Sequence, residues 1–433
     1  MSSFKGRKML YPRDFGTVTA GSGNTTHVGV SYNALRIQGY NYGANGLPNG
    51  ISNSQDDCIF PNVNLEVEFG NEVKTKSRIP LMTGALGSTF IAAKYWDSFA
   101  IGAALVGFPI VIGENVVGVD KQSIMASGRI EKAPELERRI DNYLKYYDGY
   151  GAIIVQMNVE DTRNGVAEYI IRKYGDKAII ELKWGQGAKD IGGEIQVNDL
   201  AYATFLKNRG YIVDPDPTKP EVQEAFENGA IKSFSRHSRL GYTDLSNSEQ
   251  VQEDFFKSVD YLRSLGYKRI TLKTGSYGME ALAMAIKLAT VAKLDLLTID
   301  GSGGGTGMSP WNMMESWGFL LILLHSKAYE YASILAAEGH KVVDIAFAGY
   351  SDVQKKVGAN AMKDIPYGAI AVWSLADKLA AGLQQLMAEA REFSVNNISR
   401  DDLYSGNRET MRETGIPIIT SVQDEFTKKI LNL

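Results

Sequence analysis

The stretch "AIIELKWGQGAKDIGGE", residues 178–194, decides the fold class of this chain. An apolar run, "AIIEL", is followed by two lysines, a glutamine and four glycines within residues 183–193. A short apolar run bounded by turn residues is typical of a buried strand. Glycines after it allow the backbone to approach a neighbour closely. The side chains of Lys183, Gln186 and Lys189 then either hold an anion or form a solvated turn between a strand and a helix.

The same alternation recurs along the chain from about residue 77. Apolar runs such as "RIPLMTGA" (78–85), "FPIVIGEN" (108–115), "AIIVQMNVE" (152–160) and "RITLKTG" (269–275) are each followed by a helical pattern. A final strand fragment and helix are expected at residues 369–393. Strands that alternate with helices indicate βα units and a parallel sheet. Seven or eight such units in about 320 residues favour a (β/α)8 barrel over an open doubly wound sheet.

The sequence therefore predicts an α/β protein in three parts. An irregular N-terminal segment, residues 1–76, is rich in Gly, Asn, Ser and Tyr and is expected to pack on the barrel. The barrel is expected over residues 77–395, and a C-terminal extension over residues 396–433.

Composition excludes several classes of protein. The net charge of −4 gives no sign of a surface for nucleic acid. The single cysteine excludes a disulfide framework and a cysteine-ligated iron–sulfur or zinc site within this chain. The four histidines are scattered, so no metal site is predicted. The N-terminus lacks the apolar core of a signal peptide, and "WGFLLILL" (317–324) is too short to span a bilayer. A cytoplasmic protein is expected.

Polar and glycine residues gather where the predicted strands end. In a (β/α)8 barrel the active site lies at the carboxyl ends of the strands. The residues expected there are Met82, Thr83, Gly84, Ala85, Glu114, Gln156, Lys183, Gln186, Lys189, Lys273, Gly304, Gly305, Thr306 and Gly307.

Two of these charged residues each allow two interpretations. Lys273 follows "ITL" near the end of a buried strand, where its charge is costly unless it meets an anion or an electron-rich ring. It either extends past the strand end to solvent or stabilises negative charge on a bound cofactor. Glu114 either forms a structural ion pair or acts as an acid or base. The run "GSGGGTG" (301–307) is a weak signal by itself, because it fits no dinucleotide or P-loop pattern closely.

Taken in order, these segments resemble the FMN-binding synthase domain of glutamate synthases and their stand-alone relatives. The segments "KWGQGAKDIGGE" (183–194) and "GGTGMSP" (304–310) are the most specific parts of the resemblance. The segments "IPLMTGALGS" (79–88), "GENVVG" (113–118), "RNGVAEY" (163–169) and "ITLKTG" (270–275) gain weight from their order. The similarity extends from about residue 77 to about residue 350.

The resemblance implies an FMN-dependent oxidoreductase that transfers a hydride between the flavin and the imino or amino carbon of a 2-oxo acid or amino acid. It implies that residues 82–85 place backbone against the flavin ring, that Gln156 bonds the polar edge of the ring, and that Lys273 stabilises the anionic reduced flavin. It also implies that Lys183, Gln186 and Lys189 hold the substrate, and that Glu114 handles protons. Gly349 and the "GGTG" glycines would face the cofactor.

The chain also departs from the family. It lacks the three-cysteine iron–sulfur segment and the glutamine-hydrolysing domain, so a partner subunit is expected to supply electrons or ammonia, and an oligomer is expected. The segments "FAGYSD" (347–352) and "AVWSLAD" (371–377) replace phosphate-binding glycines, and "SFSRHSRLGYTD" (233–244) replaces a loop at the substrate mouth. Two alternatives stay open: an N-methylglutamate synthase-type ligase or transferase subunit, and a barrel that has lost its flavin and serves as a subunit of a complex.

Overall fold

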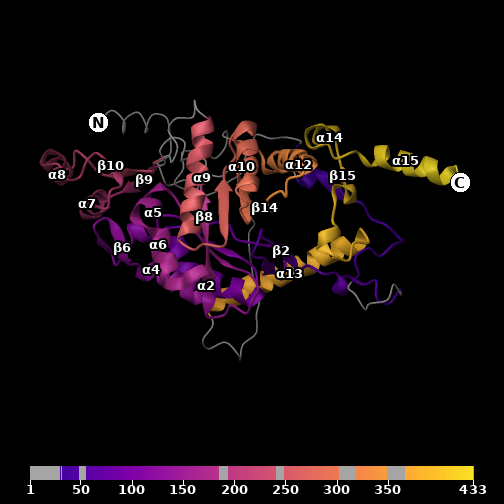
Figure 1. The fold of residues 1–433 in the computed structure, drawn as a ribbon, viewed down its shortest axis with the longest axis horizontal. Coiled ribbons are helices and arrows are strands. Elements are labelled where there is room, and N and C mark those ends of the chain that lie inside the picture. Colours follow the sequence, from indigo (N-terminus) through magenta and orange to yellow (C-terminus); the bar gives the residue numbers. More distant parts are fainter. Residues whose placement is uncertain are drawn as a thin grey trace.

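The centre of the protein is a parallel six-stranded sheet (Figure 1). The computed structural model describes residues 30, 32–47, 55–184, 194–239, 248–301, 318–348 and 366–432. Within these residues the strands lie in the order β4, β7, β8, β12, β13, β14, and each neighbouring pair is parallel. Their bounds are Ile110–Ile112, Ile153–Met157, Ala178–Lys183, Ile270–Thr274, Leu296–Asp300 and Ile345–Ala348.

The order of these strands in space is their order along the chain. A doubly wound sheet reverses its strand order at a switch point, and no reversal occurs among the described strands. Leu86 adds a further parallel bridge, to Ile112 of β4, so the segment before it lies where a preceding strand would stand. The predicted (β/α)8 fold class is therefore confirmed, as a curled sheet with the single winding of a barrel.

Helices follow the strands in alternation. The long helices are α2 (Phe90–Val106), α4 (Pro134–Leu144), α6 (Val166–Tyr174), α9 (Ser248–Ser264), α10 (Met279–Val291), α12 (Leu321–Ala337) and α13 (Tyr367–Glu389). Short helices α3 (Val116–Val119) and α5 (Val159–Asn164) follow β4 and β7.

The last helix of the predicted barrel, α13, packs against the first, α2. A Cβ on Gly102 of α2 would come within 2.6 Å of Val372, and one on Gly368 within 2.4 Å of Ser98. Contact between the last and first helices is what a ring of helices around a barrel requires. The strand fragment expected from residue 369 is wrong, because α13 already begins at Tyr367 and buries Ala369 and Ile370.

The two faces of the sheet carry different groups of apolar residues. Alternate residues of a strand point to opposite faces. The outward residues, such as Ile112, Val155 and Ile180, join the helices in the main core. The inward residues Val111, Ala152, Ile154 and Ile179 form a separate apolar cluster with Met82 and Ala85. Continuing along this inner face toward the carboxyl ends, the next residues on β7 and β8 are Gln156 and Glu181.

An insertion between β8 and α9 forms a small sheet of its own. It contains β9 (Glu194–Val197), α7 (Leu200–Asn208), β10 (Ile212–Asp214), α8 (Pro220–Glu227) and β11 (Phe234–His237). The strand order is β10, β11, β9, all antiparallel. Its own apolar core includes Leu206, Val213 and Phe234. A hairpin of β5 (Ile124–Ala126) and β6 (Arg129–Lys132) precedes α4.

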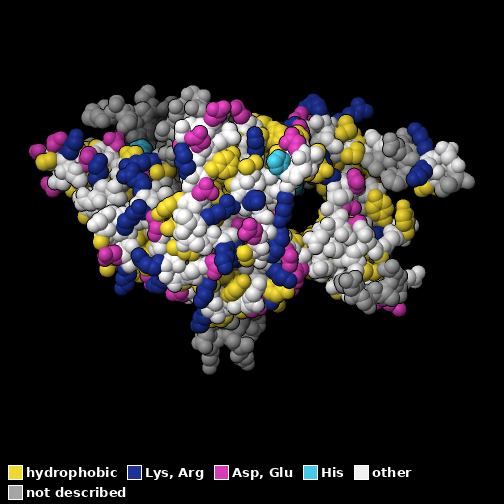
Figure 2. All heavy atoms as spheres, viewed as in Figure 1, with side chains coloured by type: hydrophobic (Ala, Val, Ile, Leu, Met, Phe, Trp, Pro, Cys, Tyr) yellow, Lys and Arg dark blue, Asp and Glu magenta, His cyan; other side chains and the backbone are white. Residues whose placement is uncertain are grey.

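The described N-terminal and C-terminal parts lie together. Strand β1 (Leu35–Ile37) pairs with β15 (Leu403–Ser405), while β2 (Val67–Phe69) pairs with β3 (Thr75–Ser77). Helices α14 (Arg408–Thr414) and α15 (Ile419–Leu431) end the chain. Figure 2 shows basic and acidic side chains interspersed on the viewed face. Of the helices described, none is both long enough and apolar enough to cross a membrane.

Candidate active site at the carboxyl end of the sheet

The first element of the site is an ion pair between Glu114 and Lys183. Glu114 follows β4, and Lys183 is the last residue of β8, so β7 lies between their strands. Nζ of Lys183 lies 3.1 Å from Oε2 and 3.3 Å from Oε1 of Glu114. The side chains are 3% and 14% exposed for Lys183 and Glu114 respectively. Two residues predicted as catalytic are thus brought together inside the curl of the sheet.

The second element is an ion pair between Lys273 and Asp300. Lys273 stands beside Lys183 in the parallel register of β12 and β8. Its Nζ lies 2.8 Å from Oδ2 of Asp300, the last residue of β13, and its side chain is 5% exposed. Burial by itself lowers the pKa of the Lys273 ammonium, but Asp300, with Glu181 and Glu114, raises that pKa above its usual value. Lys273 therefore stays inside the sheet as a cation and does not extend to solvent.

The third element joins Gln156 to Glu181 beneath these pairs. Nε2 of Gln156 donates to Oε1 of Glu181 at 2.6 Å, and the hydroxyl of Thr271 donates to Oε2 at 3.1 Å. Burial raises the pKa of the Glu181 carboxyl, and the hydrogen bond from Gln156 and the charge of Lys273 offset this only in part. Oε1 of Gln156 is buried and has no hydrogen-bond partner within the described part of the chain.

The segment Met82–Ala85 lies along the edge strand β4. The amide of Thr83 donates to the carbonyl of Pro109, and the Thr83 hydroxyl accepts from the amide of Val111. Met82 and Ala85 pack on the inner apolar cluster. A Cβ on Gly84 would meet no described atom within 4 Å, so this backbone faces open space. These four residues can therefore present backbone to a ligand at the inner face.

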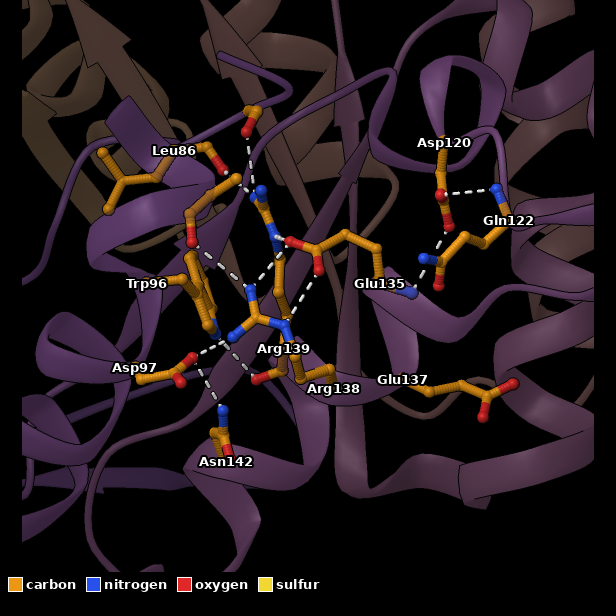
Figure 3. A network of polar contacts seen from close by, with 12 residues as sticks. Leu86, Trp96, Asp97, Asp120, Gln122, Glu135, Glu137, Arg138, Arg139 and Asn142 are labelled. Atoms are coloured by element: carbon orange, nitrogen blue, oxygen red, sulfur yellow. Dashed lines mark hydrogen bonds and ion pairs between the residues drawn. The ribbon is translucent and has the colours of Figure 1, made fainter. Parts of the chain in front are cut away.

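A buried arginine holds the end of that segment. Nη1 of Arg139, on α4, donates to the carbonyls of Leu86 at 3.0 Å and Gly87 at 2.9 Å, and its Nε donates to Glu135 at 2.8 Å (Figure 3). Gly87 in turn packs on Gly113, where a Cβ would come within 2.6 Å of the Gly87 nitrogen. Arg139 thereby fixes the loop that lies beside Glu114.

The remaining predicted residues lie outside the described part of the chain. They are Gln186, Lys189, Gly304, Gly305, Thr306, Gly307 and Gly349. Across the described ranges, no group of three or more His, Cys, Asp or Glu side chains is placed to hold a metal ion.

Sequence reasoning missed two acidic members of the site. Glu181 interrupts the apolar run "AIIEL" and Asp300 ends "LLTID". The argument applied to Lys273, that a charge in a buried strand needs a partner, applies equally to these carboxylates. This argument would have identified both Glu181 and Asp300 from the sequence.

Comparison with known proteins bears on the part of the site that carries Lys273 and Asp300. Residues 240–351 match the family model described as the conserved region in glutamate synthase. This segment of the chain is similar to that conserved region. The predicted resemblance to this family is confirmed by that match. The glutamate synthase region supplies β12, β13 and β14 of the sheet.

Two solved structures show a distant likeness to this chain. A monotopic membrane protein, (S)-mandelate dehydrogenase, is 12% identical with a TM-score of 0.40, covering 93% of this chain and 97% of its own. Old Yellow Enzyme from Pichia sp. AKU4542 is 10% identical with a TM-score of 0.27, covering 66% and 71%. Because these TM-scores are low, the fold assignment rests on the strand order. No curated protein matches the sequence.

Proposed function

We propose that the protein is an FMN-dependent oxidoreductase of the glutamate synthase-like group. Its reaction is hydride transfer between the flavin and the imino or amino carbon of an amino acid-like or 2-oxo acid substrate. The observation that carries this proposal is the buried set of Glu114, Lys183, Lys273, Asp300 and Gln156 on one inner face, at the carboxyl ends of adjacent strands. The glutamate synthase region, residues 240–351, supports the same class of enzyme.

The described residues fit the ring of a flavin. Oε1 of Gln156 is a buried acceptor without a partner among them, and a flavin ring has an imide N–H to donate. Gly84 offers backbone that faces open space. FMN, when bound, supplies the hydride chemistry that no side chain of this set can supply. Lys273 would hold positive charge near the ring, and Gln156 would orient its polar edge.

Glu114 and Lys183 are the proton-handling pair of the proposal. A carboxylate that contacts an ammonium group can give a proton to, or take one from, a substrate nitrogen within hydrogen-bond reach. Burial of both groups excludes most water from this exchange. Because Glu114 already balances the charge of Lys183, binding of an acidic substrate would depend on Lys189 and Gln186 as well.

Two other functions remain in competition. An N-methylglutamate synthase-type ligase or transferase subunit would use the same residues with methylamine in place of ammonia. A barrel without flavin would act as a subunit of a complex. In the oxidoreductase and in the N-methylglutamate synthase-type enzyme, a partner subunit would supply electrons or ammonia. The chain has only one cysteine and so cannot hold a cysteine-ligated cluster of its own.

The test is reconstitution of the purified full chain with FMN, followed by product analysis. Flavin absorbance that persists through gel filtration supports the proposal, and a colourless protein that cannot be reconstituted contradicts it. With reductant and 2-oxoglutarate, formation of glutamate from ammonia supports the oxidoreductase, whereas N-methylglutamate from methylamine supports the alternative. Glu114→Gln should abolish turnover while the flavin stays bound.

A further inference from the structure

A second charged site lies in the insertion, around Arg236. Arg236 lies on the central strand β11, opposite Ile195 of β9 and Val213 of β10. It is 5% exposed, and its guanidinium lies 5.1 Å from the ring centroid of Tyr211. In the described part of the chain no carboxylate pairs with it and no acceptor takes a hydrogen bond from its side chain. A mostly buried arginine that has no anion beside it suits a ligand that brings one.

Arg236 lines a cavity of about 290 Å³. The cavity lies between the small sheet and α7, and none of the residues around it belongs to the Glu114–Lys183 or Lys273–Asp300 pairs. Its other lining residues are Gln196, Val197, Asn198, Asp199, Tyr202 and Leu206. This volume suits a small molecule of about ten heavy atoms. The lining offers amide, apolar and aromatic side chains in addition to the charges of Arg236 and Asp199.

We propose that this cavity binds a small α-amino acid with an apolar side chain. The planar fork of an arginine matches a carboxylate in a bidentate arrangement, so Arg236 would take the α-carboxylate. Val197, Leu206 and Tyr202 would contact the apolar side chain.

Asp199 selects an amino acid over other anions. It lines the same cavity as Arg236 but forms no ion pair with it. One of its oxygens accepts from the amide of Tyr202 as the N-cap of α7, at 2.5 Å. Its negative charge disfavours a phosphate dianion and favours the ammonium group of a zwitterion.

The experiment is calorimetric titration of the full chain with L-leucine, with 4-methyl-2-oxopentanoate, which has the same skeleton without the amino group, and with inorganic phosphate. Arg236→Met removes the proposed anchor. Lys207→Met, on the outside of α7 where Lys207 pairs with Asp216 at 2.9 Å, is the matched loss of charge. Asp199→Asn removes the second charge and keeps a good N-cap.

Supporting results are binding of L-leucine by the wild type, at least tenfold weaker binding by Arg236→Met, and unchanged binding by Lys207→Met. Asp199→Asn should weaken L-leucine binding but not that of the oxo acid. Without ligand, Arg236→Met should melt at or above the wild-type temperature, because it removes an unpaired charge. Absence of leucine binding, preference for phosphate, full binding by Arg236→Met or a lower melting temperature of that variant overturns the proposal.

A double variant tests whether the measured leucine binding takes place at the candidate active site instead of in the cavity. A Glu114→Gln/Lys183→Met protein lacks the proposed catalytic pair but keeps the cavity. Leucine binding that depends on Arg236 should persist there, and its loss would overturn the assignment to the insertion. The result is independent of whether FMN binds.

Discussion

Nζ of Lys183 lies 3.1 Å from Oε2 of Glu114, although the whole of β7 separates the strands that carry them. The contact exists because both side chains project to the inner face of a curled sheet. Both are mostly buried, so neither charge can be removed alone without leaving the other poorly solvated.

Removal of one member of this pair should destabilise the protein. Lys183→Met is expected to lower the free energy of unfolding by about 3 kcal/mol, because it removes the ammonium group that balances the charge of the mostly buried Glu114 carboxylate. The double variant Lys183→Met/Glu114→Gln should recover most of the loss. Urea denaturation measures both, and Lys257→Met, at a 68% exposed side chain, should change stability by less than about 0.5 kcal/mol. A double variant as unstable as the single one would contradict a coupled pair.

Glu181 should make stability depend on pH. Its pKa is raised in the folded state, chiefly by burial. A raised carboxyl pKa means that the folded state holds the proton more tightly. The stability that Glu181 contributes is fully present below the pKa of its carboxyl in the unfolded chain, about 4.3. It is lost as the pH rises through the pKa of that carboxyl in the folded protein. Glu181→Gln should remove this loss, so the variant gains stability relative to wild type as pH rises. Parallel pH profiles of the two proteins in urea denaturation would refute the assignment.

Lys273 should affect flavin reduction at neutral pH, whereas its titration should affect the stability of the protein only at high pH. Because Asp300 raises its pKa against the effect of burial, its contribution to stability is complete below the unfolded value of about 10.4 and is lost only at higher pH. Lys273→Met should slow reduction of bound FMN at pH 7 by at least roughly tenfold, since a charge-assisted contact contributes about 1.5–3 kcal/mol. Stopped-flow absorbance measures the rate. An unchanged rate, with FMN bound, would remove Lys273 from the cofactor site.

Substitution of Arg139 should destabilise the protein much more than substitution of its neighbour Arg138. Arg139 is 1% exposed and bonds two carbonyls of the loop at Leu86 and Gly87. Arg138 is 36% exposed and bonds carboxylates near the surface. Arg139→Met should cost about 3 kcal/mol because it removes a buried donor from the carbonyls of Leu86 and Gly87.

Hydrogen exchange locates the effect of Arg139. The amide of Gly113 donates to the carbonyl of Leu86, so its exchange should accelerate in Arg139→Met more than exchange in β12 does. Arg138→Met should cost about 1 kcal/mol or less. Equal losses in the two variants would mean that Arg139 does not hold the loop.

The α/β class, the singly wound barrel, both members of the Glu114–Lys183 pair and the lysine of the Lys273–Asp300 pair could be predicted from the sequence alone. Alternating apolar runs and helical patterns report which segments are strands, because burial on both faces leaves a continuous apolar run. A lysine at the end of such a run signals a site, which is how Lys183 and Lys273 were found. The same local signal could not distinguish a strand from a helix at the start of residues 369–393. There Val372 packs against Gly102 of α2, and the segment is part of helix α13.

Which charges meet could not be predicted from the sequence. Glu114 reaches Lys183 across β7, Lys273 pairs with Asp300 on the next strand, and Gln156 bonds Glu181. These pairings depend on strand order, register and curl, and all three are set by contacts between segments far apart in the chain. Arg139, which holds the loop beside Glu114, and Arg236, which lines a separate cavity, have the same origin: their burial is a property of packing, and no local pattern of residues reports it.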